Sequence, residues 1–457
     1  MEAIGLARLA RWIGADVPAG AGDVLLTSVS TDTRALRPGA VFFALGGARH
    51  DGAAFARQAF ARGARALVVA GEVDAGPGRP VLRVACARTA LAAFAAGYRA
   101  ALGFRVVAIT GSAGKTTTKD LLHHLLRGHL GAVKAPASFN NDVGVPLTLL
   151  SADRATDVAV VEVGTSGPGE IGRLGAIARP DVAVITCIAP AHLAGLGSIE
   201  GVATEKRSLL QHLRPGGVAV LNADDHRLRP ALRPGDHACG LGQGAAWRAM
   251  ALGPLRARLT SPAGDVTFDL PVPGEPFLRS ALLALAAADV LGVPPARAAE
   301  ALSTFQAPVG RMQVTRAGGV TLVDDTYNAN PASVKASLET FAGLATDRLV
   351  VLGGMNELGA DAAEHHRAVG RQAAGLAPRL LVTVGDDARE VAAGARAAGL
   401  SAVVEVATAD DVLAALRPHL APGRAVLFKA SRGYRLERAV AAARAALTAA
   451  PPRARAA

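Results

Sequence analysis

The stretch VVAITGSAGKTTT, residues 106–118, decides the fold of this 457-residue chain. Its apolar first half predicts a buried strand over residues 105–110, and the residues after the glycine-rich turn predict a helix to about residue 127. Glycines in such a turn let consecutive backbone N–H groups face a phosphate, and the helix N-terminus adds its dipole. The order of strand, loop and helix therefore predicts a nucleotide-binding loop.

Two side chains of this loop carry its chemistry. Lys115 can reach the β and γ phosphates of a nucleotide, and the Thr116 hydroxyl can ligate Mg²⁺. The loop departs from the general pattern G-x-x-x-x-G-K-[ST], because Ile109 stands at the position of the first glycine. A glycine-rich turn with an incidental lysine is the alternative, and the flanking strand and helix favour nucleotide binding. The predicted nucleotide contacts are Gly111, Ser112, Ala113, Gly114, Lys115, Thr116 and Thr117.

Length and composition predict an α/β protein of three domains. Hydrophobic residues make up 51% of the chain and aromatic residues only 4%, which suits alternating strands and helices. At about 150 residues per domain, the chain should hold three. We expect a small N-terminal α/β domain at 1–98, a central parallel-sheet domain with the phosphate loop at 99–307 and a Rossmann-like C-terminal domain at 308–450, followed by a disordered tail at 451–457.

Short apolar runs set the predicted strands. Turn residues bound these runs and helical stretches separate them, which indicates parallel sheets covered on both faces. The predicted strands span residues 40–45 and 66–70 in the first domain, 105–110, 157–163, 181–188 and 218–222 in the second, and 320–324, 348–352, 379–384 and 425–429 in the third. Helices are predicted at residues 55–62, 280–291 and 436–449.

Charge and cysteine content narrow the functional classes. The formal net charge is +11, but the arginines are scattered and no basic stripe is interleaved with aromatic residues, so we expect no nucleic-acid partner. The positive field would instead help to collect anionic small substrates. The three cysteines are far apart and lack disulfide or zinc spacing, which indicates a reducing compartment. With no signal-peptide core and no apolar run of about 18 residues, we expect a cytoplasmic protein without a membrane span.

A carboxylate lies near the end of one predicted apolar strand. Loops at the carboxyl ends of parallel strands line the ligand crevice, so residues 138–146 and 161–166 should lie beside the phosphate loop. Glu162 falls in the second of these segments, and a buried carboxylate is costly unless it is paired or bound to a metal. With Thr116 it would supply oxygen ligands for Mg²⁺. Pairing with a buried arginine is the alternative.

Several further segments give the chain a resemblance to the Mur ligases. They are STDTR at 30–34, FNNDVGVPLT at 139–148, EVGTSGPGEI at 162–171, RPDVAVITCIAPAH at 179–192, DDTYNANP at 324–331 and KASRG at 429–433. The resemblance covers nearly the whole chain. The segment at 324–331 is the most specific of these and points to one branch of the family.

The resemblance implies a fold, a reaction and its cofactors. The chain would be a three-domain ligase that joins D-alanyl-D-alanine to UDP-N-acetylmuramoyl-tripeptide through an acyl phosphate, with ATP and two Mg²⁺ ions. The N-terminal domain would bind the UDP-sugar, the central domain would be the ATPase and the C-terminal domain would bind the dipeptide. Its partners would be these small-molecule substrates, and we expect a monomer.

The resemblance also implies roles for individual residues. Catalysis would involve Lys115, Lys206, His192 and Arg311. The Mg²⁺ ions would be held by Thr116, Glu162, His192 and Lys206, with Lys206 carbamylated so that it carries a carboxylate. Further nucleotide contacts would come from Asn140, Asn141, Arg311, Asp325, Tyr327, Asn328 and Asn330. Substrate contacts would come from Ser30, Thr31, Asp32, Thr33, Arg34, Thr165, Ser166, Lys429, Ser431 and Arg432.

The chain departs from the family pattern at peripheral contacts. Residues 274–280 read GEPFLRS and lack the two asparagines and the histidine that contact adenine in the family. Gly354 replaces an aspartate and Cys187 an asparagine. Three alternatives follow: a related ligase for another acid and amine, a non-catalytic nucleotide-binding protein, and a ligase of the folylpolyglutamate or cyanophycin type. His365 and His366 lie in a charged helical stretch and are predicted at the surface or between domains.

Overall fold

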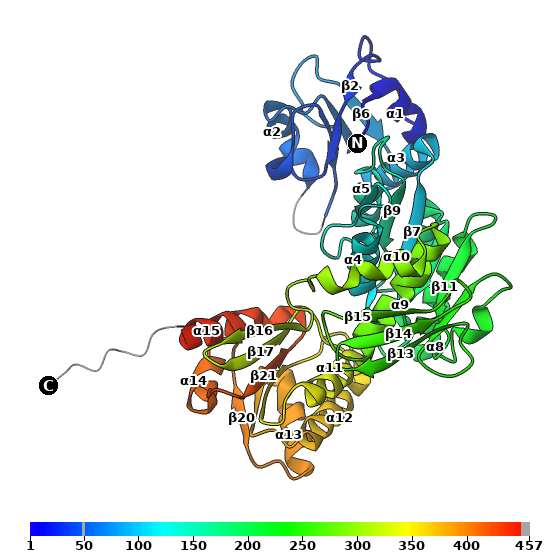
Figure 1. Cartoon of the computed structure of the whole chain (residues 1–457). Helices are drawn as coiled ribbons and strands as arrows, with labels where there is room; N and C mark the ends of the chain where they lie inside the picture. The colour runs from blue at the N-terminus through cyan, green and yellow to red at the C-terminus, as the bar shows by residue number, and fades with distance from the viewer. Residues whose placement is uncertain (48–50, 449–457) are drawn as a thin grey trace.

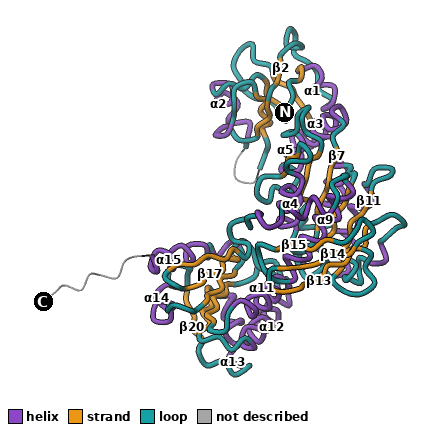
Figure 2. Tube along the Cα trace, viewed as in Figure 1, coloured by secondary structure: helices purple, strands orange, loops and turns teal. Residues whose placement is uncertain are grey.

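Three α/β domains follow one another along the molecule (Figure 1). The structure is a computed structural model that describes residues 1–47 and 51–448, so the tail predicted at 451–457 lies outside the described residues. Figure 2 shows strands at the centre of each domain with helices around them. The predicted three-domain α/β class is confirmed, while the domain borders stay predictions. No helix in the described ranges combines the length and the apolar character needed to cross a lipid bilayer.

The N-terminal domain is built on a parallel sheet of four strands in the order β3–β4–β5–β6. These strands are β3 (Ser28–Ser30), β4 (Ala40–Ala44), β5 (Ala66–Ala70) and β6 (Val81–Val84). The helices are α1 (Leu6–Ile13), α2 (Ala56–Ala61) and α3 (Ala87–Leu102), and β1 (Ile4–Gly5) pairs with β2 (Leu25–Leu26) in a separate ribbon. Every residue of β4 is buried, which explains why its continuous apolar run was recognisable in the sequence.

The central domain is built on a nine-stranded sheet in the order β15–β14–β13–β12–β11–β10–β7–β9–β8. Its strands are β7 (Arg105–Thr110), β8 (Ala132–Lys134), β9 (Val158–Glu162), β10 (Val182–Ile185), β11 (Val218–Asn222), β12 (His237–Gly240), β13 (Trp247–Gly253), β14 (Arg256–Thr260) and β15 (Val266–Asp269). Its helices are α4 (Lys115–Leu126), α5 (Gly144–Leu149), α6 (Glu170–Ala178), α7 (Leu193–Leu196), α8 (Ile199–Arg207), α9 (Glu275–Val290) and α10 (Pro295–Glu300). The carboxyl ends of parallel β7, β9 and β10 share one edge, where the phosphate loop begins.

One edge of the central sheet is antiparallel, in contrast to the parallel sheet predicted from the sequence. Neighbouring strands are parallel from β8 to β13, and β13, β14 and β15 then pair antiparallel. Along β14 the buried Ala257 and Leu259 alternate with the exposed Arg256 and Arg258. Such alternation belongs to a half-exposed strand and contains no continuous apolar run. Apolar runs in the sequence therefore do not reveal this strand.

The C-terminal domain is built on a six-stranded sheet in the order β16–β17–β21–β18–β19–β20, parallel except for β16. The strands are β16 (Gln313–Ala317), β17 (Val320–Asp325), β18 (Arg348–Gly353), β19 (Leu380–Val384), β20 (Val403–Val406) and β21 (Ala425–Lys429). The helices are α11 (Pro331–Leu344), α12 (Ala362–Gly375), α13 (Arg389–Ala397), α14 (Val412–Leu416) and α15 (Glu437–Thr448). All four strands predicted for this domain are found.

His366 is buried, which corrects the prediction of a surface or interdomain position for this residue. Its Nε2 accepts a hydrogen bond of 2.8 Å from the Met355 N–H, and its Nδ1 lies 2.7 Å from the Ala362 carbonyl oxygen. A ring with one accepting and one donating nitrogen satisfies both groups inside the domain. Charged neighbours on the exposed side of α12 concealed this role in the sequence. His365 is half-buried.

Helix α3 joins the N-terminal and central domains through one shared core. Phe94 stacks on Phe43 of the N-terminal sheet with ring centroids 6.0 Å apart, and Tyr98 meets Phe94 edge-on at 6.1 Å. The Tyr98 hydroxyl donates to the Ala152 carbonyl and accepts from the Glu2 N–H, each at 2.6 Å. Burial raises the pKa of Tyr98 to about 12. This hydroxyl therefore satisfies two backbone groups from distant parts of the chain.

The substitution Tyr98→Phe should lower the free energy of unfolding by about 1–3 kcal/mol, because two backbone groups lose their partner. Urea unfolding followed by circular dichroism measures the loss. Tyr434→Phe is the matched control and should cost less, since the Tyr434 hydroxyl donates to the exposed Asp387 carboxylate at 2.7 Å. Equal losses in the two variants would contradict this role for the Tyr98 hydroxyl.

Candidate active site between the central and C-terminal domains

The phosphate loop connects β7 to α4, as the sequence predicted. Gly111 has a φ of 146°, and a Cβ at this position would lie 1.8 Å from Thr186 Oγ1, so only glycine fits. Gly114, which precedes α4, has a φ of 80°, a left-handed conformation that favours glycine. The Ser112 N–H donates to the Cys187 carbonyl at 2.9 Å and ties the loop to the end of β10.

Glu162 ends β9 and is 1% exposed, so its carboxylate needs partners inside the protein. Thr116 Oγ1 donates to its Oε2 at 2.7 Å, and Asn140 Nδ2 donates to its Oε1 at 3.0 Å. The ammonium of Lys119 lies 3.9 Å from Oε2. These partners replace the buried arginine that was the alternative. Arg311 instead donates to the Thr116 hydroxyl, at 2.9 Å. Thr116 and Glu162 thus form a pair of hard oxygen donors suited to Mg²⁺.

Lys119 belongs to this site, although no role was predicted for it from the sequence. Its side chain is 0% exposed, and its ammonium donates to the carbonyl oxygens of Ala135, at 3.0 Å, and Ala137. Ala137 has a φ of 47°, a left-handed conformation that is unfavourable for alanine. This turn leads to Ser138 and Asn140, which line the cavity beside the loop. The rarity of lysine in an arginine-rich chain was the signal that could have found it.

Burial lowers the pKa of three side chains predicted to be catalytic. Desolvation lowers the pKa of Lys115, and the Glu162 charge opposes this effect. Lys206 on α8 is 1% exposed, and desolvation followed by the charge of Lys115 lowers its pKa to about 7. Desolvation also lowers the pKa of His192, while the Glu357 carboxylate opposes it. An amine and an imidazole that are readily neutral therefore lie near the phosphate loop.

Side chains of the C-terminal domain reach across to the central domain. The guanidinium carbon of Arg311 lies 4.1 Å from the centroid of the Tyr327 ring, which holds the cation in place. The Tyr327 hydroxyl shares a hydrogen bond with the Ser138 hydroxyl. Asn330 Nδ2 donates to the Ser112 carbonyl at 3.4 Å. Three residues predicted to contact the nucleotide are thus brought to the phosphate loop by the packing of the two domains.

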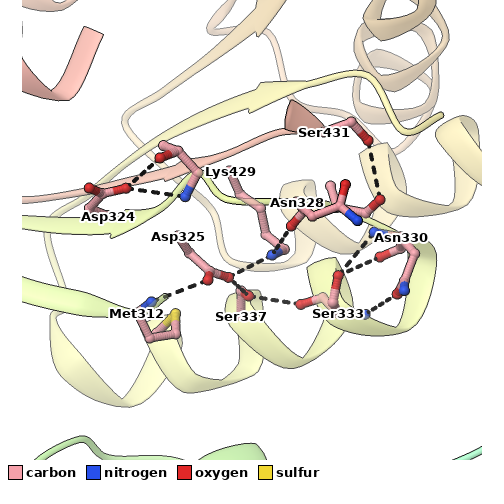
Figure 3. Close-up of polar contacts among 11 residues, drawn as sticks. Met312, Asp324, Asp325, Asn328, Asn330, Ser333, Ser337, Lys429 and Ser431 are labelled. Carbon is pink, nitrogen blue, oxygen red and sulfur yellow. Dashed lines mark hydrogen bonds and ion pairs between the residues drawn. The ribbon is translucent and has the colours of Figure 1, made fainter. Parts of the chain in front are cut away.

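A buried ion pair supports the segment at 326–330 (Figure 3). Lys429 is 2% exposed, and its ammonium donates to Asp325 Oδ2 at 2.6 Å and to the Asn328 carbonyl at 3.0 Å. The Ser337 hydroxyl donates to the same carboxylate oxygen at 2.5 Å. Because these bonds join β17, β21 and α11, they fix the loop that presents its polar side chains to the central domain.

Two cavities with volumes of about 850 and 320 Å³ lie between the central and C-terminal domains. Lys115, His192 and Tyr327 border both of them. The larger cavity extends from the phosphate loop to the start of α9, near Glu275, and to Thr340 on α11. A cavity of this size can hold a nucleotide. The smaller one is lined by further residues of the C-terminal domain, including the predicted substrate contact Arg432.

Other predicted site residues do not line either cavity. Asn141 Oδ1 accepts from the Gly144 N–H at 2.9 Å at the start of α5. The Thr165 hydroxyl donates to the Gly167 carbonyl at 2.7 Å, next to Ser166. The roles given to these three residues stay predictions. The same holds for Ser431, which is 1% exposed and whose hydroxyl donates to the Ala329 carbonyl at 3.2 Å.

The predicted UDP-sugar contacts lie in the N-terminal domain, around the end of β3. Ser30 Oγ donates to the Asp32 carbonyl at 2.8 Å, and Thr33 Oγ1 donates to Gln58 Oε1 at 2.8 Å. The Arg34 side chain and N–H both donate to the Asp32 carboxylate and lower its pKa to about 2. Thr31 completes this turn. The cluster offers charged and hydroxyl groups, and its role in binding stays a prediction.

Comparisons with known proteins agree with this arrangement. The family model described as Mur ligase family, catalytic domain matches residues 25–99. The Mur ligase middle domain matches residues 109–288, and the Mur ligase, glutamate ligase domain matches residues 310–432. The UDP-N-acetylmuramoyl-tripeptide–D-alanyl-D-alanine ligase of Bacillus subtilis is 33% identical over 423 residues, which cover 91% of this chain and 93% of that protein.

Solved structures extend the similarity to the arrangement of the domains. A crystal structure of MurF from Acinetobacter baumannii superposes with a TM-score of 0.88 at 28% identity, and covers 97% of this chain and 99% of that chain. MurF ligase from Thermotoga maritima, solved in complex with ADP, has a TM-score of 0.82 at 27% identity and covers 92% of this chain and 97% of that chain. The overlap spans all three domains.

The substitution Lys119→Met should lower kcat of the ATP-dependent reaction by about 100-fold, because a small displacement of Ser138 and Asn140 is expensive for the chemical step. The KM for ATP should change little, since Lys115 is untouched. Steady-state kinetics separates the two constants, and thermal melting checks that the variant folds. Lys119→Gln should be impaired less, since its amide can still donate to one carbonyl.

Lys134→Gln is the matched control for this experiment. Lys134 ends β8 and pairs at 2.6 Å with Asp120, which lies next to Lys119 on α4. The Lys134 side chain is 35% exposed and, in the part of the chain that the structure describes, makes no hydrogen bond to the turn at Ala137. It should keep kcat close to the wild-type value. A folded Lys119→Met variant with wild-type kcat would show that Lys119 does not position the turn.

Proposed function

The chain belongs to the Mur ligase family, and we propose that it joins D-alanyl-D-alanine to UDP-N-acetylmuramoyl-tripeptide with ATP, a step in the synthesis of peptidoglycan precursors. One observation carries the proposal: the phosphate loop, the Glu162 carboxylate and the Arg311 guanidinium converge on the Thr116 hydroxyl. Arg311 comes from the C-terminal domain, so the site is assembled from two domains. The DDTYNANP segment supplies Tyr327 and Asn330 to the same interface.

The reaction needs activation because a peptide carboxylate is a poor electrophile. In the proposed reaction, a carboxylate oxygen of the tripeptide attacks the γ phosphorus of ATP, and ADP leaves. The dipeptide amine then attacks the acyl phosphate, the C–N bond forms, and phosphate leaves as the amine loses a proton. Lys115 and Arg311 would neutralise the charge on the transferred phosphoryl group. Closure of the two domains around the bound substrates would keep water from the acyl phosphate.

Thr116 and Glu162 fit one Mg²⁺, because both are buried oxygen donors 2.7 Å apart at the phosphate end of the cavity. Within residues 1–47 and 51–448, no three His, Cys, Asp or Glu side chains form a cluster that could hold a metal ion. A second Mg²⁺ at His192 would therefore need a further donor. The cations would balance phosphate charge during phosphoryl transfer.

Lys206 fits the role of that further donor once it is carbamylated. Only a neutral amine reacts with carbon dioxide, and burial lowers the pKa of Lys206 to about 7. The neighbouring Glu205 does not occupy the amine, since its carboxylate accepts from the N–H groups of Gly169 and Ile171 at 2.7 Å each. A carbamate would turn this buried lysine into a carboxylate within range of the Lys115 charge, which adds to burial in lowering the pKa of Lys206.

The function is tested by phosphate release from ATP in the presence of UDP-N-acetylmuramoyl-tripeptide. D-alanyl-D-alanine should stimulate release, and mass spectrometry should detect the pentapeptide product. Lys115→Ala should abolish turnover in a folded protein, because the phosphates lose their lysine contact. Lys335→Ala, which removes an exposed lysine of α11, should keep it. Bound ATP with no stimulation by the dipeptide would reject the proposed substrate.

The substitution Lys206→Ala should abolish turnover, and short carboxylic acids such as acetate should partly restore it. Acetate can supply the carboxylate that the carbamate would have provided. Bicarbonate alone should not rescue the variant, because no amine remains. Turnover is measured by phosphate release over a series of acetate concentrations. An active variant that does not respond to acetate would end the carbamate proposal.

The same lysine predicts a pH-dependent cost to stability in bicarbonate-free buffer. The folded pKa of about 7 lies below the ordinary value of 10.5, so the folded state disfavours the protonated amine. This penalty, on the order of a few kcal/mol, is present in full below pH 7 and disappears as the pH rises toward 10.5. Lys206→Met should therefore be more stable than wild type at pH 6, and the difference should shrink by pH 9 in urea unfolding.

A further inference from the structure

A carboxylate of the C-terminal domain meets a histidine of the central domain at the border of the two cavities. Glu357 Oε2 lies 2.5 Å from His192 Nδ1. Glu357 lies in the loop between β18 and α12, and His192 immediately precedes α7. The two residues belong to different domains, so this pair exists only while the domains are in contact.

Both members of the pair adopt a left-handed backbone conformation. The φ angle is 53° at His192 and 63° at Glu357. This conformation costs roughly 1–2 kcal/mol for a residue other than glycine, so the surrounding structure must hold it in place. The His192 carbonyl accepts from the N–H groups of Gly195 and Leu196 at 3.0 and 2.9 Å, which fixes the turn on the central side.

Buried side chains fix the turn on the C-terminal side. The Met355 N–H donates to His366 at 2.8 Å, and the Asn356 N–H donates to the Ser431 hydroxyl at 3.0 Å. His366 and Ser431 are 2% and 1% exposed. These two bonds hold the two residues that precede Glu357. The loop therefore presents this carboxylate from a rigid base.

The chemistry of the contact determines the state of the imidazole. An ionised carboxylate can only accept a hydrogen bond, so Nδ1 must carry the proton. In the neutral ring, Nε2 then keeps its lone pair for a cation. We propose that Glu357 is a positioning residue that orients His192 as a ligand for a divalent cation, so that the cation site is complete only when the C-terminal domain has closed. The inference rests on the proposed function, which gives His192 that role.

The small free energy that this ion pair can contribute to folding favours a positioning role over a stabilising one. The side chains of His192 and Glu357 are 30% and 57% exposed. Ion pairs with this exposure contribute about 0–1 kcal/mol to folding. The left-handed conformations of the two residues together cost more free energy than the ion pair contributes. The contact therefore does not stabilise the fold on balance. Loss of an outer hydrogen-bond partner from a metal-binding histidine, in contrast, weakens metal affinity or activity by about 10–100-fold.

The test uses Glu357→Gln and Glu357→Ala in the full-length enzyme, with Mn²⁺ as the probe. Electron paramagnetic resonance measures Mn²⁺ binding in the presence of a non-hydrolysable ATP analogue. We expect the weaker of two Mn²⁺ affinities to fall by about 10–100-fold in Glu357→Ala, with kcat falling by a similar factor and the melting temperature unchanged. Glu357→Gln should fall less, because its amide oxygen can still accept from Nδ1.

Glu364→Gln is the matched control, since Glu364 is an exposed carboxylate of the same domain that pairs with Arg371 at 2.6 Å. It should bind Mn²⁺ and turn over as wild type does. Small-angle X-ray scattering in the presence of the ATP analogue should show that the C-terminal domain of Glu357→Ala still closes on the central domain. A variant that fails to close would mean that Glu357 holds the two domains together, which would overturn the inference. Wild-type Mn²⁺ affinity and kcat in Glu357→Ala would also overturn it. If the wild-type enzyme binds Mn²⁺ and ATP but forms no amide product from the two proposed substrates, the proposed function is overturned instead.

Discussion

The site depends on one costly group, the Glu162 carboxylate at the end of an otherwise apolar strand. Removing such a charge from water costs several kcal/mol unless hydrogen bonds and opposite charge replace the solvent. The chain provides Thr116 from the phosphate-loop helix, Asn140 from the neighbouring loop and Lys119 from one turn further along α4. Each partner comes from a different position in the sequence. The need to satisfy one carboxylate therefore fixes the loops that surround it.

The domain interface extends this constraint to the C-terminal domain. Arg311 reaches the Thr116 hydroxyl, which already donates to Glu162, so the two domains share one hydrogen-bond chain. The Lys429–Asp325 pair stiffens the loop that carries Tyr327. Loops held by hydrogen bonds on both sides give the interface a defined geometry, which the proposed reaction through an acyl phosphate would require.

Sequence patterns identified the parts of the structure in which one local property decides the outcome. Strands buried on both faces, such as β5 and β21, matched their apolar runs residue for residue. The antiparallel edge at β14 did not, because half-exposed strands mix arginine with apolar residues. The place of Glu162 at the end of an apolar strand identified this carboxylate, the resemblance supplied Arg311, and the structure brings both to the loop. The contacts of Lys119 and Glu357 could not be predicted because their partners are distant in sequence. The buried position of His366 was concealed by the charged residues around it on α12.

One departure from the family pattern, the glycine at position 354, can be explained by its neighbours in the structure. A side chain at Gly354 would meet the Tyr434 hydroxyl at 2.2 Å, and that hydroxyl donates to Asp387, so a carboxylate remains beside this position although the aspartate is gone. A Cβ at Gly274 would meet Thr340 of α11 at 2.3 Å. The segment at 274–280 therefore lies where the start of α9 meets α11, at the border of the larger cavity. Nothing in the structure explains the loss of the asparagines and the histidine from this segment, while the phosphate end keeps the hydrogen-bond partners that the buried Glu162 carboxylate needs.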